Sequence, residues 1–401
     1  MSEWKTEALG KIARTTSGGT PDKKHPEYYG GSIPWVRSGE LDKGLITDTE
    51  IKITQAGLDN SSAKIFPEGT LLIALYGATI GKIAFLGIPA ATNQAVCAIF
   101  ENEKVSLKYL YYFLLFKRPD LIKQGVGGAQ PNISQAILKR LPVHYPTSLT
   151  EQQRIVARIE ELFSQLDSGV ETLRKTKQQL AVYRQAVLKE AFDTALYECK
   201  MLPIEKLLTK DRKGMSTGPF GTMIKKQDHK TSGIPMLGIE NIGKGKFVDG
   251  NKIFVTPEKG EELKSFALKA GDIIISRSGT VGEICAVPKR AEGALLSTNL
   301  MRISLDSSIV ESDYFISLFQ SKGVVLDQIK ELCKGSTRDF LNQTILKQIR
   351  FPVPSVDKQK TIVETIDARM SVCDSIEQTV DAALQQAEAL RQSILKRAFE
   401  N

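Results

Sequence analysis

Two stretches of the chain, residues 151–199 and 357–401, carry apolar residues at alternating spacings of three and four. No proline interrupts either stretch. This spacing places apolar side chains on one stripe of a long helix. We therefore predict two long helices that pack against each other, the first with Thr150 as its N-cap. The predicted packing residues are Ile159, Leu162, Leu166, Leu173, Leu180, Val187, Ile366, Cys373, Ile376, Val380, Leu390 and Ile394.

The rest of the chain has a different pattern. Short apolar runs typical of strands occur at residues 70–76, 95–100, 272–276 and 300–305, separated by Gly, Asn and Pro. A short helix is predicted after each pair of runs, at residues 107–116 and 312–320. These segments predict two globular parts of the α+β class.

A repeat relates the two halves of the chain. The segment YRQAVLKEAFD, at residues 183–193, recurs as LRQSILKRAFE at residues 390–400. Shorter phrases recur in the same order, such as GATIGKIA and SGTVGEIC. The chain is therefore two copies of one unit, each a globular part followed by a helix.

The repeat predicts four segments. They are a globular part at 1–150, a helix at 151–199, a second globular part at 200–356 and a second helix at 357–401. We expect the helices to run antiparallel as a spacer, related by a pseudo-twofold axis. The second copy of the repeated segment should then dock on the first globular part as the first copy docks on the second.

Charge indicates what the globular parts contact. The chain has a net charge of +8 and a pI near 9.0. The positive excess lies in the globular parts, whereas the predicted helices are slightly acidic. Basic surfaces attract polyanions such as nucleic acids, so the globular parts are the candidates for that contact. The helices are the candidates for contacts with protein or with each other.

The sequence lacks several chemical signatures. Its five cysteines form no CxxC pair, and its three histidines have no metal-ligand spacing, so we expect no metal site. GATIGK is one residue too short for a phosphate-binding loop and is interpreted as a turn. No adenine-methyltransferase motif occurs, and no catalytic arrangement is evident. We expect a non-catalytic cytoplasmic chain with no signal peptide, no membrane span and no cofactor of its own.

Basic and polar residues between the predicted strands are the candidate DNA contacts. Lysine and arginine bind phosphates, and arginine and polar side chains also read base edges. The candidates are Lys23, Lys24, Arg37, Lys213, Ser216, Thr217, Lys225, Lys226, His229, Lys230, Arg277, Thr337 and Arg338. We interpret the aromatic residues Phe220, Tyr28 and Tyr29 as packing residues, with stacking on bases as the alternative.

Longer phrases resemble a known family. They include TSGGTP, EYYGGSIPWVRSGEL, LIALYGATIGKIA and the run from GGAQPNIS to EQQRIVARIEELFSQLD, with IPMLGIENI and GDIIISRSGTVG in the second half. They are similar to the specificity (S) subunit of type I restriction–modification systems, over essentially the whole chain. The second half departs from the pattern, with GSTRDFLN in place of GGAQPNIS and DKQKTIV in place of EQQRIV.

The resemblance implies a function. Such a subunit has no catalysis of its own and reads a two-part, asymmetric sequence of double-stranded DNA, one half with each target-recognition domain. The helices set the gap between the two halves. It binds two methyltransferase (M) subunits, which carry S-adenosylmethionine, and in the full enzyme two restriction (R) subunits, which use ATP and Mg²⁺. The alternatives are a coiled-coil scaffold that binds RNA or protein, and a self-sufficient DNA-modifying enzyme.

Overall fold

The computed structural model describes residues 3–125, 132–220, 222–243, 245–278, 281–321, 323–333 and 341–400, and only the backbone of 194–198 and 333. Contacts between residues divide the chain into two compact units. Unit 1 contains Met1–Leu173 and Ala382–Asn401, and unit 2 contains Arg174–Asp381. Each unit thus combines one globular module with a part of both long helices. We call residues 3–148 module one and residues 199–355 module two.

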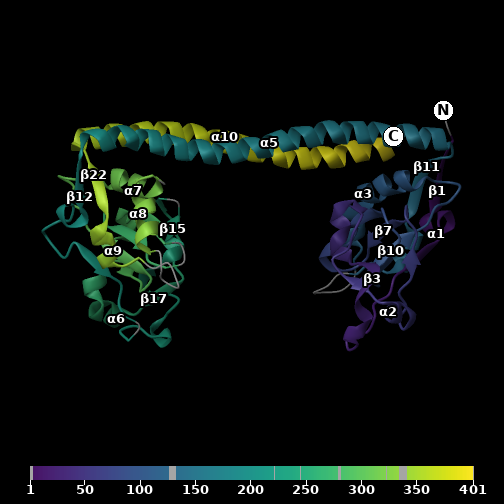
Figure 1. Ribbon diagram of the computed structural model, residues 1–401, viewed down its shortest axis with the longest axis horizontal. Helices are drawn as coiled ribbons and strands as arrows, with labels where there is room; N and C mark the ends of the chain where they lie inside the picture. Colours follow the sequence, from purple (N-terminus) through teal and green to yellow (C-terminus); the bar gives the residue numbers. More distant parts are fainter. Residues whose placement is uncertain are drawn as a thin grey trace. The chain divides into compact units, whose positions relative to one another are not determined.

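Module one consists of three small sheets and short helices (Figure 1). The central sheet has the order β2 (Thr15–Ser17), β10 (Val96–Ile99), β7 (Leu71–Ala74), β8 (Ile83–Leu86), β4 (Leu45–Ile46). A second sheet has the order β5 (Lys52–Ile53), β3 (Tyr29–Val36), β9 (Ala90–Thr92), β6 (Ile65–Phe66). The pair β1 (Trp4–Ala8) and β11 (Pro142–Pro146) is antiparallel. The helices are α1 (Leu9–Ile12), α2 (Gln55–Asp59), α3 (Leu107–Lys123) and α4 (Gln135–Arg140).

The apolar runs become strands because both faces of the central sheet are buried. Every residue of β7 and β10 is buried. Alternate residues of a strand face opposite sides. Leu71 and Ile73 accordingly pack in the cluster that contains α3, whereas Leu72 and Ala74 pack in the cluster around Val36. The central sheet is therefore the middle layer of module one.

Module two repeats these connections. Its central sheet has the order β13 (Met215–Thr217), β21 (Leu300–Ile303), β18 (Ile273–Ser276), β19 (Ile284–Ala286), and its second sheet β17 (Ile253–Val255), β14 (Ile234–Leu237), β20 (Leu295–Leu296). The remaining pairs are β12 (Lys200–Pro203) with β22 (Arg350–Val353) and β15 (Ile242–Gly243) with β16 (Lys246–Phe247). The helices are α6 (Pro257–Glu262), α7 (Ser312–Gln320), α8 (Val325–Cys333) and α9 (Gln343–Gln348).

The repeat in sequence is therefore a repeat in fold. The antiparallel order β2-β10-β7-β8 in module one corresponds to β13-β21-β18-β19 in module two. Each second sheet contains one parallel pair, β3 with β9 and β14 with β20. The predicted fold class, two α+β modules with two long helices, is confirmed.

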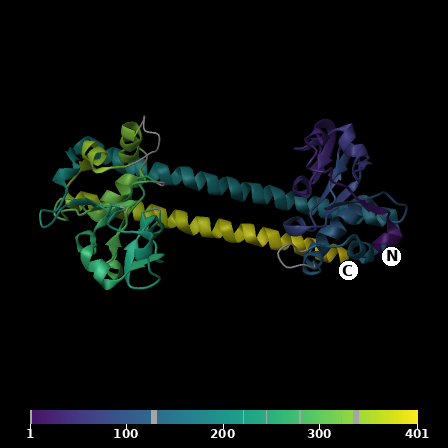
Figure 2. The same ribbon diagram turned by 90° about the horizontal axis from the view of Figure 1, so that it is seen from below.

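Each long helix is a single uninterrupted element: α5 covers Leu149–Glu198 and α10 covers Val356–Phe399 (Figures 1 and 2). The first helix begins before Thr150. The hydroxyl of Ser148 accepts a hydrogen bond from the Glu151 N–H at 3.4 Å, so Ser148 has the place predicted for Thr150. Two serine or threonine candidates stand close together here, and sequence alone does not choose between them.

One buried glutamine joins each module to its helix. Gln152 is fully buried, and its amide donates to the carbonyls of Lys104 and Pro146, both at 2.9 Å. Its carbonyl accepts from the Ser106 N–H at 2.9 Å. All three partners belong to module one, so this single side chain fixes the first turn of α5 to the module.

Gln359 does the same in module two. It is fully buried and donates to the carbonyls of Ile309 and Pro354, at 2.9 and 2.8 Å, while it accepts from the Glu311 N–H at 2.8 Å. At the offset of 207 residues, the second half reads KQK where the first reads EQQ, and the middle glutamine, which anchors the helix, is kept.

The repeated segment docks in the same way in both units. Phe192, in the first copy, is fully buried, and its ring lies 5.7 Å from that of Tyr314 in α7 of unit 2. Phe399, in the second copy, is 3 % exposed and lies 5.2 Å from Tyr109 in α3 of unit 1. Tyr109 and Tyr314 are each the third residue of their helix. The end of the chain therefore docks on module one.

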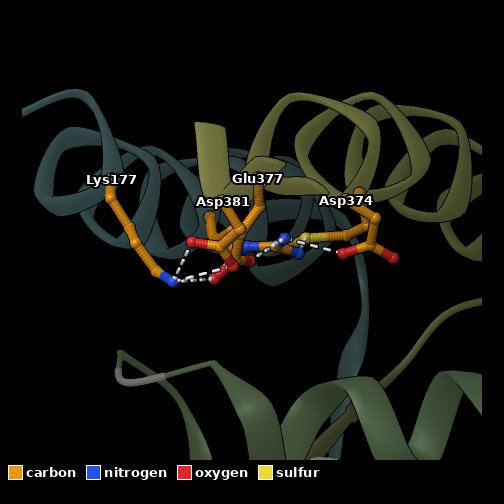
Figure 3. A network of polar contacts seen from close by, with 6 residues as sticks. Lys177, Asp374, Glu377 and Asp381 are labelled. Atoms are coloured by element: carbon orange, nitrogen blue, oxygen red, sulfur yellow. Dashed lines mark hydrogen bonds and ion pairs between the residues drawn. The ribbon is translucent and has the colours of Figure 1, made fainter. Parts of the chain in front are cut away.

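The two helices run antiparallel within unit 2. Along α5, Lys177, Arg184 and Glu190 form ion pairs with residues of α10 in reverse order, namely Asp381 at 2.7 Å, Asp374 at 2.6 Å and Arg369 at 2.5 Å. Figure 3 shows the Lys177 ammonium paired with the carboxylates of Asp381 and Glu377. Arg184 also pairs with Glu377 at 3.0 Å. In unit 1, Arg391 of α10 pairs with Asp167 of α5.

The predicted packing residues of the two helices differ in burial. Six of its residues are buried, namely Ile159, Leu180, Val187, Ile366, Cys373 and Val380. Four are half-buried, namely Leu162, Leu166, Leu173 and Ile394.

The prediction is wrong for Ile376 and Leu390, which are 40 % and 50 % exposed. Buried positions in α10 recur every seven residues, at Ile366, Cys373 and Val380. The heptad positions between them include Arg369, Ile376 and Leu390. These positions lie at the edge of the contact between the helices, where Arg369 forms an ion pair with Glu190.

Candidate nucleic-acid interface

Three loops of module one meet at one end of the central sheet. Gly18, after β2, donates its N–H to the Val96 carbonyl at 3.1 Å, and Gly19 donates to Thr92 at 2.9 Å. Leu75, after β7, donates to Ala95 at 2.8 Å. Loops that follow different strands are thus held side by side by backbone hydrogen bonds, and we call this end of each central sheet the loop edge.

The loop edge of module two is built in the same way. Gly218, after β13, donates its N–H to the Leu300 carbonyl at 3.1 Å. Arg277, after β18, donates its N–H to Asn299 at 3.0 Å and accepts from Leu341 at 3.0 Å. The phrases shared by both halves of the sequence therefore form the framework of this edge.

Glycine is required where the first loop leaves each sheet. A Cβ atom on Gly18 would lie 2.1 Å from the Thr92 carbonyl oxygen, and one on Gly218 would lie 1.8 Å from that of Ser297. Backbone cannot yield to a contact that close. These glycines therefore set the path of the loops that carry the candidate residues.

The GATIGK segment is a turn, as predicted. It connects β7 and β8, and the Ala74 N–H donates to the Lys82 carbonyl at 2.8 Å. Gly77 and Gly81 have φ of 61° and 70°, the left-handed conformation that glycine adopts without strain. The Lys82 ammonium pairs with Asp42.

In module one, the candidates Lys23 and Lys24 are exposed in the loop after β2. Arg37 follows β3, at the loop edge, because the Asn93 N–H donates to the carbonyl of the preceding Val36 at 3.0 Å. Its guanidinium pairs with Glu50, and the two side chains are 43 % and 62 % exposed. Such a pair contributes at most about 1 kcal/mol, so a phosphate or base can replace Glu50.

Three polar atoms at this edge lack a partner. Within the described part of the chain, Arg37 Nε, Thr92 Oγ1 and Asn93 Oδ1 are buried without a hydrogen bond. A buried polar atom without a partner is destabilising. These atoms belong to residues that make or adjoin the Val36–Asn93 contact, where the loop after β3 meets the loop before β10.

In module two, four candidates lie together around the short turn Lys226–Asp228. They are exposed and consist of Lys225, Lys226, His229 and Lys230. Lys213 is also exposed, and its carbonyl accepts from buried Arg302 at 3.0 Å. The loop around Lys226–Asp228 therefore exposes four basic side chains.

The remaining candidates of module two differ in accessibility. Ser216 is 8 % exposed within β13, so the structure removes it from the candidate contacts. The sequence did not reveal that Ser216 lies in a strand, because a strand of three residues is too short to show a periodic pattern. Thr217 is half-buried at the strand end. Thr337 and Arg338 lie outside the described residues.

Arg277 is tied into the loop edge. Its guanidinium donates to the carbonyls of Thr298 at 3.3 Å and Leu341 at 3.4 Å, and it is half-buried. Burial lowers the pKa of Arg277, because a low-dielectric environment disfavours the charged form. Arg277 therefore joins the segment after β18 to the segment before β21 and to the segment that begins at Leu341, and its charge lies at the loop edge.

The aromatic residues divide in two groups. Tyr29 packs edge-on against Trp35 with ring centroids 6.1 Å apart and donates its hydroxyl to the Pro21 carbonyl at 2.6 Å. Tyr28 stacks on His25 at 4.8 Å. Phe220, by contrast, is 74 % exposed, so its interpretation as a packing residue is wrong.

Among the described residues, no group of His, Cys, Asp and Glu could hold a metal ion. No described helix is long and apolar enough to cross a membrane.

The sequence matches the model of the family "Type I restriction modification DNA specificity domain" over residues 1–180 and 220–386. The chain belongs to this family. In this specificity-domain protein, the first matched segment contains module one and part of α5. The second contains most of module two and part of α10. The repeat seen in the strand order is therefore a repeat of the family's domain.

Relatives of this specificity-domain protein span nearly its whole length. The chain is 25 % identical to the StySPI specificity subunit of Salmonella potsdam, over 99 % of this chain and 88 % of the relative. It is 26 % identical to the EcoKI specificity subunit of Escherichia coli K12, over 92 % of this chain and 82 % of the relative.

Solved structures share the fold. One comes from a study of complex assembly and conformational transition of the type I R-M system, with a TM-score of 0.72, 18 % identity and coverage of 99 % of this chain and 97 % of that one. The HsdS subunit from Thermoanaerobacter tengcongensis has a TM-score of 0.57, 18 % identity and coverage of 99 % and 96 %.

Proposed function

We propose that this chain is the DNA-recognition subunit of a type I restriction–modification enzyme, in which each module reads one half of a two-part target. One observation carries the proposal. The two loop edges have the same backbone framework but different side chains, with Lys23, Lys24 and Arg37 in module one and the basic loop around Lys225 in module two. A shared framework suits phosphate contacts, and differing side chains suit two different half-sites.

The chain itself is non-catalytic in this proposal. The double-stranded DNA target is bound by the modules, and two methyltransferase subunits dock on the helices, which set the gap between the half-sites. S-adenosylmethionine is bound by the methyltransferase subunits, and ATP and Mg²⁺ by the restriction subunits of the full complex. A DNA-recognition role would place the chain in the cytoplasm. The family membership and the curated relatives, all specificity subunits, support these assignments.

Mapping of methylated bases tests the proposal. DNA from cells that express this chain with its methyltransferase subunit is compared with DNA from cells that express the methyltransferase subunit alone. We expect methylated adenines in a two-part asymmetric motif only when both are present. Unchanged methylation, with the complex shown to be assembled, would favour the scaffold alternative.

A further inference from the structure

Phe220 has the largest exposed fraction among the large apolar side chains of the described residues, 74 %. Phenylalanine is commonly buried in folded proteins. Met223, in the same loop, is 40 % exposed. The loop therefore presents an apolar tip to its surroundings.

The loop that carries Phe220 is fixed on both sides. Before it, the Gly218 N–H bonds to Leu300 at 3.1 Å and Pro219 is buried. After it, Ile224 is 8 % exposed and belongs to an apolar cluster of module two. Between these anchors the Met223 N–H donates to the Phe220 carbonyl at 2.9 Å, which closes a tight turn. Because the anchors bury their side chains, the exposure of Phe220 is built into the fold of the loop.

The part of the loop that follows this turn is basic. Lys225 and Lys226 follow it directly and are exposed. The one nearby acid in the loop, Asp228, accepts a hydrogen bond from the Lys225 N–H at 2.7 Å. The loop also begins at the loop edge, because Gly218 abuts Ser297. An exposed aromatic ring flanked by cations fits a DNA duplex better than an apolar protein surface.

The first loop of module one has no such tip. This loop, residues 18–25, reads GGTPDKKH and contains no large apolar side chain. Thr20 there hydrogen-bonds to Gln94, and Pro21 is buried. The two modules therefore differ in the kind of contact their first loops can make.

We propose that Phe220 inserts between two neighbouring base pairs of the half-site read by module two, while Lys225 and Lys226 bind the flanking phosphates. The inference rests on the proposed function. Apolar side chains act as wedges of this kind in other DNA-bending proteins, and pyrimidine–purine steps open most readily. Module two then selects its half-site partly through the deformability of one base step, and module one does not.

The test uses the full chain assembled with its methyltransferase subunits and duplexes that contain the mapped target. The fluorescent base 2-aminopurine is placed in turn at each position of both half-sites except the methylated adenines, because methyltransferases flip their target base out of the stack. We expect its fluorescence to rise on binding at one step of the second half-site and at no step of the first. Phe220→Ala should abolish the rise and weaken binding about ten-fold or more. Phe220→Trp should retain both, and Val248→Ala, another exposed apolar residue of module two at 44 %, is the control with no effect.

The outcomes separate the inference from the proposed function. An unchanged affinity and fluorescence profile in Phe220→Ala, with the wild-type motif still methylated, would overturn the wedge and leave the proposed function standing. Weaker assembly with the methyltransferase subunits and an unchanged DNA signal would assign Phe220 to a protein contact, which also overturns it. If the wild-type chain directs no methylation at all, the proposed function fails.

Discussion

At the scale of single residues, Gln152 and Gln359 anchor the two long helices to their modules. Each is a fully buried amide whose three hydrogen bonds connect the first turn of a long helix to a module. A buried group that loses its partner costs more than the bond itself contributes.

Substitution of Gln152 tests this anchor. Gln152→Leu leaves two carbonyls and one N–H of module one without their partner, and we expect the free energy of unfolding of unit 1 to fall by about 3 kcal/mol. The measurement is denaturant unfolding of the full chain followed by a probe in module one. Gln153→Leu, at the neighbouring exposed position, is the control. Equal effects of the two substitutions would contradict the anchoring role.

The basic loop makes a prediction about salt. Lys225→Ala with Lys226→Ala should weaken DNA binding for all sequences alike and reduce the slope of log K against log salt by about 2. The control is Lys259→Ala with Lys264→Ala, which changes the net charge equally but removes ammonium groups already paired with Glu262 and Glu261. Binding would be measured by fluorescence anisotropy at several salt concentrations. A slope that changes equally in both variants would show that only net charge matters.

At the scale of elements, the repeated segment YRQAVLKEAFD and LRQSILKRAFE forms the docking end of each helix. Phe399 packs among Tyr109, Phe113 and Phe116 of α3, with ring centroids 5.2, 5.4 and 5.7 Å away. This contact is what joins the last turns of α10 to unit 1.

Removal of that ring should release the end of α10. Phe399→Ala leaves a cavity among the rings of α3, and we expect a loss of about 3–4 kcal/mol of local stability. Hydrogen exchange of residues 382–400 should become faster while module two is unaffected. Leu390→Ala, at a position that is 50 % exposed, should leave the exchange unchanged. Slow exchange that persists in Phe399→Ala would mean that another contact holds this end.

Sequence could predict the helices, the strands and the docking of their ends, because each rests on a local pattern or on the repeat. It could not predict that Ile376 and Leu390 lie on the rim of the helix pair. Both keep the heptad spacing, and which row of a helix is covered depends on where the second helix passes. The same limit applies to Gln152, because its burial requires carbonyls that three different loops bring together.

The candidate site was predicted less completely than the fold. The exposed lysines of both modules lie in loops, as expected from charged residues between strands. Ser216 was predicted to be accessible to DNA but is buried, and Phe220 was predicted to be a packing residue but is exposed. A serine is small enough to be buried inside a short strand. The ring of Phe220 is exposed because Pro219 and Ile224, on either side of it, are buried and hold the loop in place.

At the scale of the whole molecule, each module is proposed to read its own half-site within a common framework. The equivalent strand pairs β1 with β11 and β12 with β22 mark the two places where a module joins its helices. Because these joints correspond, one module can replace the other without altering the helix ends. The replacement would change one half-site only.

The most direct measurement is the methylation motif of a chain in which Trp4–Pro146 replaces Lys200–Val353. We predict a motif in which the half-site of module one occurs twice, in inverted orientation, and the half-site of module two is lost. Wild-type chain mapped in the same cells provides the reference motif, and assembly of the hybrid with the methyltransferase subunits must be shown. A hybrid complex that still methylates the original asymmetric motif would contradict the claim that each module reads its own half of the target.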